Sequence, residues 1–251
     1  MGQIEVIKLN EVDLVPFGET SILVEFGRGI NPETHKKVKT LTNYLERQPF
    51  AGMLEYVSAF SSVTVSYDPM KVRSLQREQG RTATTAYEAV TSLLTEIIAK
   101  MEQGKEEQPR EVRIPVCYGG EFGPDLAFVA EHNGCTPEEV IAIHSGGQYL
   151  VYMLGFAPGF PYLGGMSDKI AAPRRQSPRM EIPAGSVGIA GLQTGVYPIA
   201  TPGGWQLIGR TPLDLFCPNE QPPTLLQAGD LITFYPISPG QYAQHKEDGG
   251  K

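Results

Sequence analysis

The chain has 251 residues, a formal net charge of −7 and three cysteines. Its length exceeds one typical domain, and a chain of this size buries a sizeable core without disulfide bonds. The acidic balance argues against general nucleic-acid binding, and the cysteines form no CxxC pair that would indicate a zinc or redox centre. No signal peptide and no run approaching the roughly 20 apolar residues of a membrane helix is visible, so we expect a cytoplasmic protein that binds neither membranes nor nucleic acid.

The first part of the chain predicts alternating strands and helices. Asn31 and Pro32 are typical of a helix start, with an N-cap residue followed by a proline at the first helical position. An apolar stripe over 82–101 predicts a helix packed on a core, and Thr85 with Glu88 forms a capping-box pattern. Helices alternating with strands in this way favour a ferredoxin-like layer. The strand candidates are 14–16, 21–26, 54–60 and 63–67.

The second part of the chain has a different composition. A polar, charged stretch at 102–111 indicates a linker, and two short helices follow a strand at 112–116. Most prolines and glycines lie beyond residue 145, between several short strands, which indicates a closed or sandwiched β-structure. The polar residues from Ser238 onward predict a disordered tail. The strand candidates are 149–154, 186–190, 196–199, 205–208 and 231–235.

Two segments stand out for their chemistry. LGFAPGFPYLGGM, at 154–166, is too apolar for a linker, and its mixture of glycine and proline specifies one irregular path. APRRQSPRM, at 172–180, gathers three arginines in an acidic chain. We expect Arg174 or Arg179 to contact an anionic group, the alternative being a solvated loop. The single tryptophan, Trp205, is expected to anchor a core.

The remaining polar residues do not form a complete catalytic apparatus. The sequence has no Walker A, Rossmann GxGxxG or HExxH pattern. His144 stands at a predicted helix end, where the helix dipole favours a cation, and is either functional or a capping and packing residue. Gln193 and Thr194 are hydrogen-bonding groups among glycines that let a ligand or a second backbone come close. These residues together predict an anion-friendly, glycine-lined β-pocket without a metal site.

Several long motifs occur in a fixed order, among them IPVCYGGEFGPDL, YLVYMLGFAPGFPYLGGM, GIAGLQTGVYPIATPGGWQLIGRTPLDLF and PPTLLQAGD. With DLVPFGETSILVEFG near the start, they resemble the bacterial family of the 5-oxoprolinase B subunit, which includes a sporulation-kinase inhibitor and allophanate hydrolase subunit 1. The resemblance implies an α+β chain with two domains. These are an N-terminal ferredoxin-like domain and a C-terminal cyclophilin-like β-barrel. With the linker and the polar tail indicated by composition, we expect the first domain at 1–101, the linker at 102–111, the barrel at 112–237 and the tail at 238–251.

The resemblance also implies partners and a reaction. The family's B subunit works with the C and A subunits of 5-oxoprolinase, and the three together open 5-oxoproline to glutamate with ATP hydrolysis. Phosphorylation of the unreactive lactam oxygen creates a leaving group before water attacks. We expect the chain alone to be inactive, with ATP bound either here or on a partner. The alternatives are a protein that inhibits a sensor histidine kinase and a subunit of urea or allophanate metabolism.

The resemblance assigns no catalytic residue, and it implies candidates for a ligand- or partner-binding groove by motif position only. The candidates are His144, Phe156, Pro158, Arg174, Arg179, Gln193, Thr194, Trp205 and Arg210.

Overall fold

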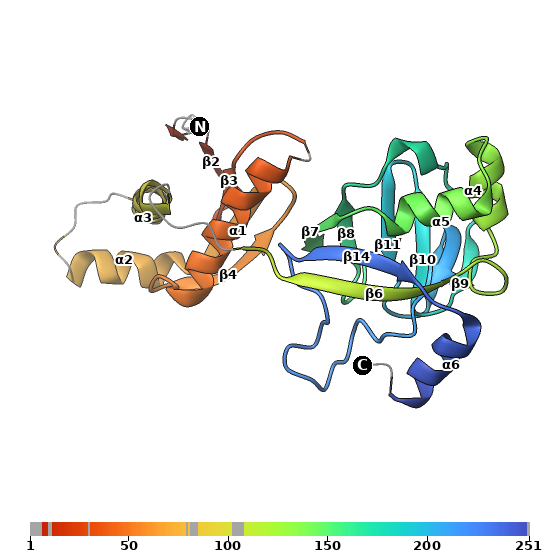
Figure 1. Cartoon of the computed structure of the whole chain (residues 1–251). Helices are drawn as coiled ribbons and strands as arrows, with labels where there is room; N and C mark the ends of the chain where they lie inside the picture. Colours follow the sequence, from red (N-terminus) through yellow and green to blue (C-terminus); the bar gives the residue numbers. More distant parts are fainter. Residues whose placement is uncertain are drawn as a thin grey trace. The chain divides into compact units, whose positions relative to one another are not determined.

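The computed structural model describes residues 7–9, 12–29, 31–78, 80, 85–101 and 108–249. The chain divides into two compact units, 1–108 and 109–251, each with its own buried core (Figure 1). No helix in these described ranges is long and apolar enough to cross a membrane.

The first unit is a five-stranded antiparallel sheet with three helices. The strand order is β1-β2-β3-β5-β4, and every neighbouring pair is antiparallel. Helix α1 connects β3 to β4, and β5 lies between these two strands, so they form a split β-α-β unit. The elements are β1 (Ile7–Leu9), β2 (Val12–Pro16), β3 (Ser21–Glu25), α1 (Pro32–Arg47), β4 (Met53–Ser58), β5 (Ser62–Tyr67), α2 (Pro69–Glu78) and α3 (Ala86–Met101).

The core of the first unit follows from alternation along the strands. Strand β5 alternates half-buried and buried residues, so that Val63 and Val65 face the core while their neighbours face away. The stripe on α1 and α3 supplies the other side of this core, with Leu41 and Leu94 fully buried. The N-cap predicted for α1 is confirmed, because the Asn31 side chain accepts a hydrogen bond from the Glu33 N–H.

Helix α2 was not predicted from the sequence, although its start repeats the pattern of α1. Asp68 precedes Pro69, and the Asp68 carboxylate accepts hydrogen bonds from the Met70 and Lys71 N–H groups. An acid before a proline therefore begins a helix here, in the same way as Asn31 before Pro32. The predicted start of the next helix, 82–84, lies outside the described residues, and the predicted capping box of Thr85 and Glu88 is confirmed.

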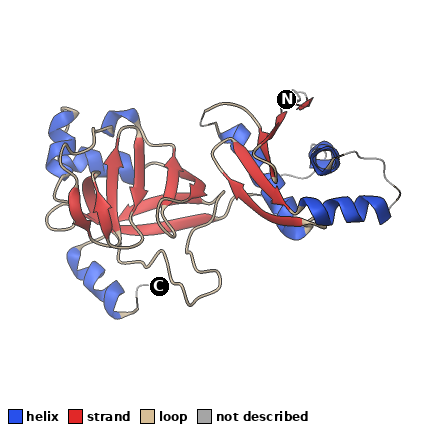
Figure 2. Cartoon of the chain, turned by 180° about the vertical axis from the view of Figure 1, so that it is seen from behind, coloured by secondary structure: helices blue, strands red, loops and turns tan. Residues whose placement is uncertain are grey.

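The second unit is a nearly closed barrel of seven strands. The strand order is β11-β10-β13-β6-β14-β7-β8, with β6 and β14 parallel and the other neighbours antiparallel. The two outermost strands, β8 and β11, lie against each other, and β9 pairs with β12 as a separate ribbon. Figure 1 labels β8 and β11, and Figure 2 shows the strands of the barrel from behind, in red. The elements are β6 (Glu111–Tyr118), α4 (Leu126–His132), α5 (Pro137–Ser145), β7 (Tyr149–Leu154), β8 (Pro161–Gly164), η1 (Asp168–Ile170), β9 (Arg179–Ile182), β10 (Ser186–Ala190), β11 (Gln193–Val196), β12 (Thr201–Gly203), β13 (Gln206–Arg210), β14 (Leu231–Pro236) and α6 (Pro239–Glu247).

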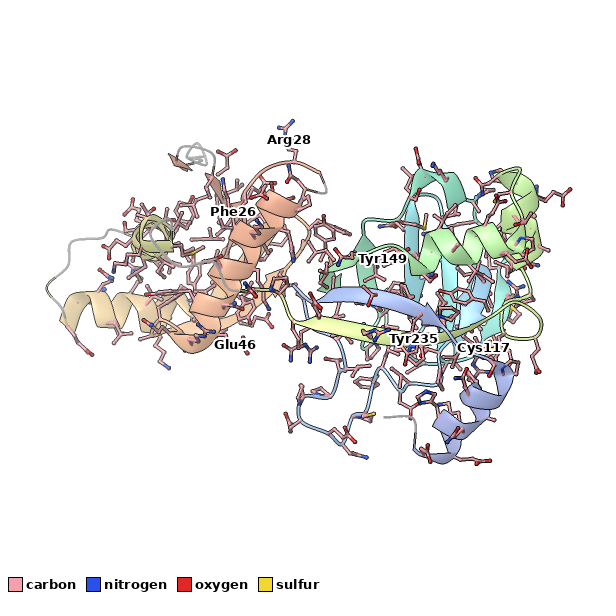
Figure 3. All side chains as sticks on the ribbon, viewed as in Figure 1. Phe26, Arg28, Glu46, Cys117, Tyr149 and Tyr235 are labelled. Carbon is pink, nitrogen blue, oxygen red and sulfur yellow. The ribbon has the colours of Figure 1, made fainter. Side chains whose placement is uncertain are left out.

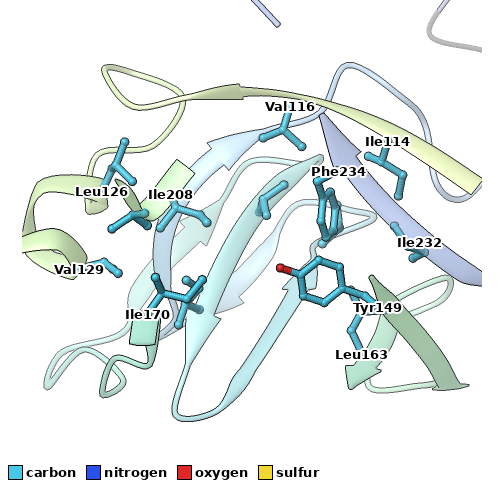
Figure 4. Close-up of a cluster of buried hydrophobic side chains, with 14 of the residues drawn as sticks. Ile114, Val116, Leu126, Val129, Tyr149, Leu163, Ile170, Ile208, Ile232 and Phe234 are labelled. Carbon is cyan, nitrogen blue, oxygen red and sulfur yellow. The ribbon is translucent and has the colours of Figure 1, made fainter. Parts of the chain in front are cut away.

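The interior of the barrel is filled by apolar side chains from most of its strands. Tyr149 and Phe234 face each other edge to face, with ring centroids 5.2 Å apart, among aliphatic residues such as Ile114 and Ile232 (Figure 4). The barrel interior is therefore a packed core. Outside this core cluster, the next residue on β14, Tyr235, lies under the Arg113 guanidinium, which is 4.9 Å from the ring centroid (Figure 3 labels Tyr235).

Two boundary predictions differ from the structure. Residues 102–107 of the predicted linker lie outside the described residues, but its last residues belong to the barrel. The Arg110 guanidinium binds the Asp230 carboxylate through Nε at 2.9 Å and through Nη2, and β6 begins at Glu111. The predicted disordered tail is wrong, since helix α6 forms there with a capping box between Ser238 and Gln241. A short polar helix such as α6 has no apolar stripe, so only its capping residues indicate it in the sequence.

Candidate functional site

The candidate residues lie in the second unit, in two distinct environments. His144 and Thr194 point into the barrel core and are fully or almost fully buried. Phe156, Arg174 and Pro158 are exposed, and Arg179 is half-buried. The structure therefore divides the predicted groove residues into an interior pair and an outer set.

His144 is held in the core by both ring nitrogens. The Thr194 hydroxyl donates to the Gly188 carbonyl at 3.1 Å, so it accepts from His144 Nε2–H at 2.9 Å. The Tyr118 hydroxyl then donates to His144 Nδ1 at 2.8 Å. The ring stacks on Phe234 with centroids 4.6 Å apart. This network fixes one neutral tautomer and satisfies every polar atom in it.

Burial lowers the pKa of His144 to about 3. The expectation of a cation at this helix end is therefore wrong, because the cost of desolvating an imidazolium exceeds the attraction of the helix dipole. Burial also raises the pKa of Tyr118 and of Tyr149, whose hydroxyl donates to the His144 carbonyl at 2.7 Å. His144 and Thr194 are interior hydrogen-bonding groups of the barrel.

The arginine loop is tied to the start of α4 by a buried carboxylate. Asp125 accepts from Arg175 Nη1 at 3.1 Å and from Arg179 Nη2 at 2.8 Å, both through Oδ1. Its other oxygen accepts the Leu207 N–H at 2.7 Å. Asp125 is only 6% exposed, and it gives no side-chain cap to its own helix. Sequence reasoning missed Asp125, because its arginine partners are 50 and 54 positions away in the chain.

The cluster holds more donors than its carboxylate accepts. Two guanidinium groups, of Arg175 and Arg179, bind the one carboxylate of Asp125, so this group of three side chains carries an excess positive charge. Arg175 Nε and Arg179 Nη1 are buried and have no hydrogen-bond partner in the described part of the chain. Such a cluster can hold a further anionic oxygen by charge-assisted hydrogen bonds.

A separate aromatic cluster lies beside the arginine loop. Phe160 contacts Tyr197 and Trp205 edge to face, with ring centroids 5.6 and 5.7 Å apart. A Cβ on Gly195 would lie 3.0 Å from Phe160 Cζ and 3.1 Å from Trp205 Cζ3. The prediction that Trp205 anchors a core is confirmed, and the glycine that seemed open to a ligand makes room for this chain's own rings.

The loop between β7 and β8 is built from two tight turns. The Ala157 N–H donates to the Gly155 carbonyl at 2.8 Å, and Phe156 between them has φ +67°. This is the strained form of the γ-turn, rare for a residue with a side chain. The next turn is centred on Pro158–Gly159 and closes when the Phe160 N–H donates to the Ala157 carbonyl at 3.0 Å, as in a type II turn.

The arginine loop and the aromatic cluster meet at Tyr197. Burial raises the pKa of Tyr197, while a backbone hydrogen bond with Trp205 and the charges of Arg174 and Arg179 oppose that shift. The exposed ring of Phe156 extends the cluster, edge to face on Phe160 at 5.5 Å. Sequence reasoning also missed Tyr197. We call the following residues, of which Phe156 and Arg174 are exposed, the arginine–aromatic cluster: Phe156, Phe160, Arg174, Arg179, Tyr197 and Trp205.

Arg210 and Gln193 have other partners in the structure. Arg210 Nε donates to the Ala184 carbonyl at 2.7 Å, which fixes the turn before β10. Gln193 begins β11 and pairs with Ala190 across the hairpin. The described residues contain no group of three or more side chains that could hold a metal ion.

Comparison with known proteins identifies the family. Residues 12–226 match the family described as carboxyltransferase domain, subdomain C and D. The chain is 55% identical over 231 residues to the 5-oxoprolinase B subunit of Bacillus subtilis (strain 168), with 92% of this chain and 95% of that protein covered. The chain belongs to the 5-oxoprolinase B-subunit family. The 5-oxoprolinase B subunit of Escherichia coli O157:H7 is 40% identical over 223 residues, with 89% and 95% covered.

Solved structures share the fold. TTHA0988 superposes with a TM-score of 0.70 at 34% identity, covering 87% of this chain but only 40% of the TTHA0988 chain. The conserved uncharacterized protein PH0987 from Pyrococcus horikoshii has a TM-score of 0.52 at 44% identity, covering 91% of this chain and 99% of that chain. Urea amidolyase of K. lactis, at 20% identity and a TM-score of 0.67, shows the same fold over 98% of this chain and 16% of its own.

Proposed function

We propose that this chain is the B subunit of an ATP-dependent 5-oxoprolinase, which opens 5-oxoproline to glutamate together with its C and A subunits in the cytoplasm. The single observation that carries the proposal is the 55% identity to a 5-oxoprolinase B subunit over 95% of that protein. A match of this length includes both units, so the likeness is to the whole protein and not to one shared domain.

The proposal divides the chemistry among the subunits. Opening a lactam needs activation, because the amide carbonyl is a poor electrophile, and phosphoryl transfer from ATP to the lactam oxygen supplies a leaving group before water attacks. The buried carboxylate of Asp125 is held in ion pairs with Arg175 and Arg179, which gives it a structural role in the barrel. We therefore assign this chain binding and positioning roles, with phosphoryl transfer and hydrolysis requiring the assembled complex.

Two fold assignments accompany the function. The order β2-β3-β5-β4, all antiparallel, is the ferredoxin-like order with its last strand moved to the front of the chain, and the split β-α-β unit supports it. The nearly closed barrel with α4 and α5 supports a cyclophilin-like second domain. We propose these as the folds of the two units, with the domain boundary at 108/109.

Within this function, we assign the arginines of the arginine–aromatic cluster to contact with an anionic group. Arg174 is exposed, and none of the ion pairs among the described residues includes it. A charge-assisted hydrogen bond contributes about 1.5–3 kcal/mol, so Arg174→Ala should weaken that contact roughly 10–150-fold. Arg179 is the poorer choice for such a test, because it also binds the buried Asp125.

The experiment is reconstitution from purified subunits. The chain is mixed with the C subunit, the formation of a complex is followed by analytical ultracentrifugation, and glutamate release from 5-oxoproline with ATP is measured before and after the A subunit is added. The proposal predicts a stable complex with the C subunit, no turnover by the chain alone, and turnover with all three subunits. Robust ATP-dependent turnover by the isolated chain, or silence of the full mixture while the chain binds a sensor histidine kinase, would contradict it.

A further inference from the structure

The turn between helices α4 and α5 contains the only asparagine in the sequence that is followed by glycine, Asn133 before Gly134. Asparagine is a thermolabile residue. A following glycine has no side chain to hinder its backbone nitrogen, so that nitrogen attacks the asparagine side chain more readily than the nitrogen of any other residue. Gly134 is exposed, and nothing lies within 4 Å of the position that a Cβ would take there. Water therefore reaches a turn whose chemistry permits a spontaneous modification.

The modification is deamidation through a cyclic imide. The Gly134 nitrogen loses its proton and forms a bond to Asn133 Cγ, while the bond between Cγ and Nδ2 breaks and the side-chain nitrogen leaves with that proton as ammonia. Water then opens the ring. Its addition at Cγ gives aspartate, and its addition at the Asn133 backbone carbonyl gives isoaspartate. Water is the one co-reactant, and a neutral amide becomes a negatively charged carboxylate.

The fold holds both reacting groups away from this reaction. Asn133 Nδ2 donates to the Val129 carbonyl at 2.8 Å and to the Ala171 carbonyl at 3.1 Å. The Gly134 N–H donates to the Glu131 carbonyl at 3.1 Å, in the turn that ends α4. Attack requires the side chain to turn and the backbone nitrogen to give up its proton. These hydrogen bonds must therefore break first, in a local opening of the turn.

The Asn133 side chain also connects α4 to the arginine loop. Ala171 immediately precedes that loop, and Asp125 at the other end of α4 binds Arg175 and Arg179. Helix α4 is therefore bound to the segment 171–179 at both of its ends. A carboxylate in place of the asparagine amide has no hydrogen to donate, so its oxygens would face two carbonyl oxygens. Its charge would also lie at the negative end of the helix.

We propose that Asn133 is a deamidation site that the native fold keeps latent, and that its conversion to aspartate or isoaspartate breaks one of the two attachments of α4 to the arginine loop. The other contacts of the loop remain, since Asp125 still binds its two arginines and the Ala172 carbonyl still accepts the Gly191 N–H at 2.7 Å. The modification therefore loosens the start of the loop without unfolding the barrel. This inference does not depend on the proposed function.

The first test follows deamidation of the natural chain at mildly alkaline pH, folded in buffer and unfolded in concentrated urea. Digestion and tandem mass spectrometry locate the modified residue. The unfolded chain should deamidate first at Asn133. The folded chain should react there at least about fivefold more slowly, because its side-chain hydrogen bonds must break first. A smaller difference, or no deamidation at Asn133 in urea, would overturn the proposal.

The second test measures thermal unfolding through the fluorescence of Trp205, the one tryptophan, which lies in the second unit. Asn133→Asp, which has the sequence of the deamidated product, should lower the midpoint by about 3–9 °C, because two hydrogen bonds are lost. It should also speed amide hydrogen exchange at Gly191, whose N–H is bound to the start of the arginine loop.

The matched control is Asn219→Asp, which adds the same charge at an exposed position of the same unit. It should leave the midpoint and the exchange at Gly191 unchanged. An unchanged midpoint or unchanged exchange for Asn133→Asp would show that the asparagine does not hold the loop. Equal effects of the two substitutions would assign the loss to charge alone, and either result would overturn the proposal.

Discussion

Asp125 is the buried carboxylate that binds two side chains of the arginine loop. Asp125→Ala would leave two guanidinium groups and the Leu207 N–H without their acceptor. We expect the free energy of unfolding to fall by about 2–4 kcal/mol, less than for a fully buried pair because the Arg175 side chain is 36% exposed. Urea unfolding of the full chain, followed by the fluorescence of its one tryptophan, measures the change.

Asp214→Ala is the matched control. Asp214 also pairs with a cation, Lys246 at 2.9 Å, but both side chains are largely exposed. We expect a change of about 0–1 kcal/mol. Equal effects of the two substitutions would show that burial of Asp125 does not determine its contribution.

His144 gives the barrel a pH dependence of known sign. Burial lowers its pKa to about 3 from the ordinary value of 6.5, so below pH 6.5 the unfolded chain takes up a proton that the folded chain does not. Stability should therefore fall as the pH drops from 6.5 toward 3, by up to about 1.4 kcal/mol per pH unit from this residue. The measurement is the unfolding free energy at several pH values for the natural chain and for His144→Gln. The variant should have the shallower slope, and identical slopes would refute the assignment.

At the scale of elements, local chemistry determines where helices begin. The prediction that Ser238 begins a disordered tail is wrong because Ser238 accepts the Gln241 N–H and Gln241 accepts the Ser238 N–H. Ser238→Ala should cost the helix about 1 kcal/mol and speed amide hydrogen exchange in the first turn of α6 about fivefold. Ser238→Asp keeps an acceptor at the cap and should exchange like the natural chain. Equal rates for the two variants would show that the cap does not hold α6.

The same local rules explain what could be predicted and what could not. Capping patterns such as Asn31 before Pro32 act over a few residues, so sequence reasoning identified helix α1 and its start. The Asp125 cluster joins residues 50 and 54 positions apart, and its partners follow from barrel closure. The γ-turn at Phe156 is likewise set by tertiary packing beneath the loop. The sequence therefore predicts the candidate residues, and the fold decides which of them meet.

At the scale of the whole molecule, the contacts of Arg110 test where the second unit begins. Arg110 binds the Asp230 carboxylate and the Leu225 carbonyl, and its own carbonyl accepts the Leu231 N–H. A fragment of residues 109–251 should be more stable than one of 112–251 by about 1–3 kcal/mol, because Asp230 is buried and loses its cation in the shorter one. Thermal unfolding of the two fragments decides this, and equal midpoints would place Arg110 in a linker.

Limited proteolysis of the full chain addresses the same boundary. We expect the first cuts between Gln103 and Pro109, because few contacts cross a domain linker. The barrel fragment released by such a cut should stay folded. Early cuts within 150–210 with 103–109 intact would contradict the two-unit description.

The measurement that tests the central claim most directly is omission of this chain from the reconstituted complex. Glutamate release from 5-oxoproline at saturating ATP is compared between a three-subunit mixture, in which this chain is the B subunit, and a mixture of the A and C subunits alone. We predict ATP-dependent turnover only in the three-subunit mixture, and restoration of turnover when the chain is added back to the other two. Equal turnover in the absence of this chain, or no turnover with it present, would contradict its assignment as the B subunit.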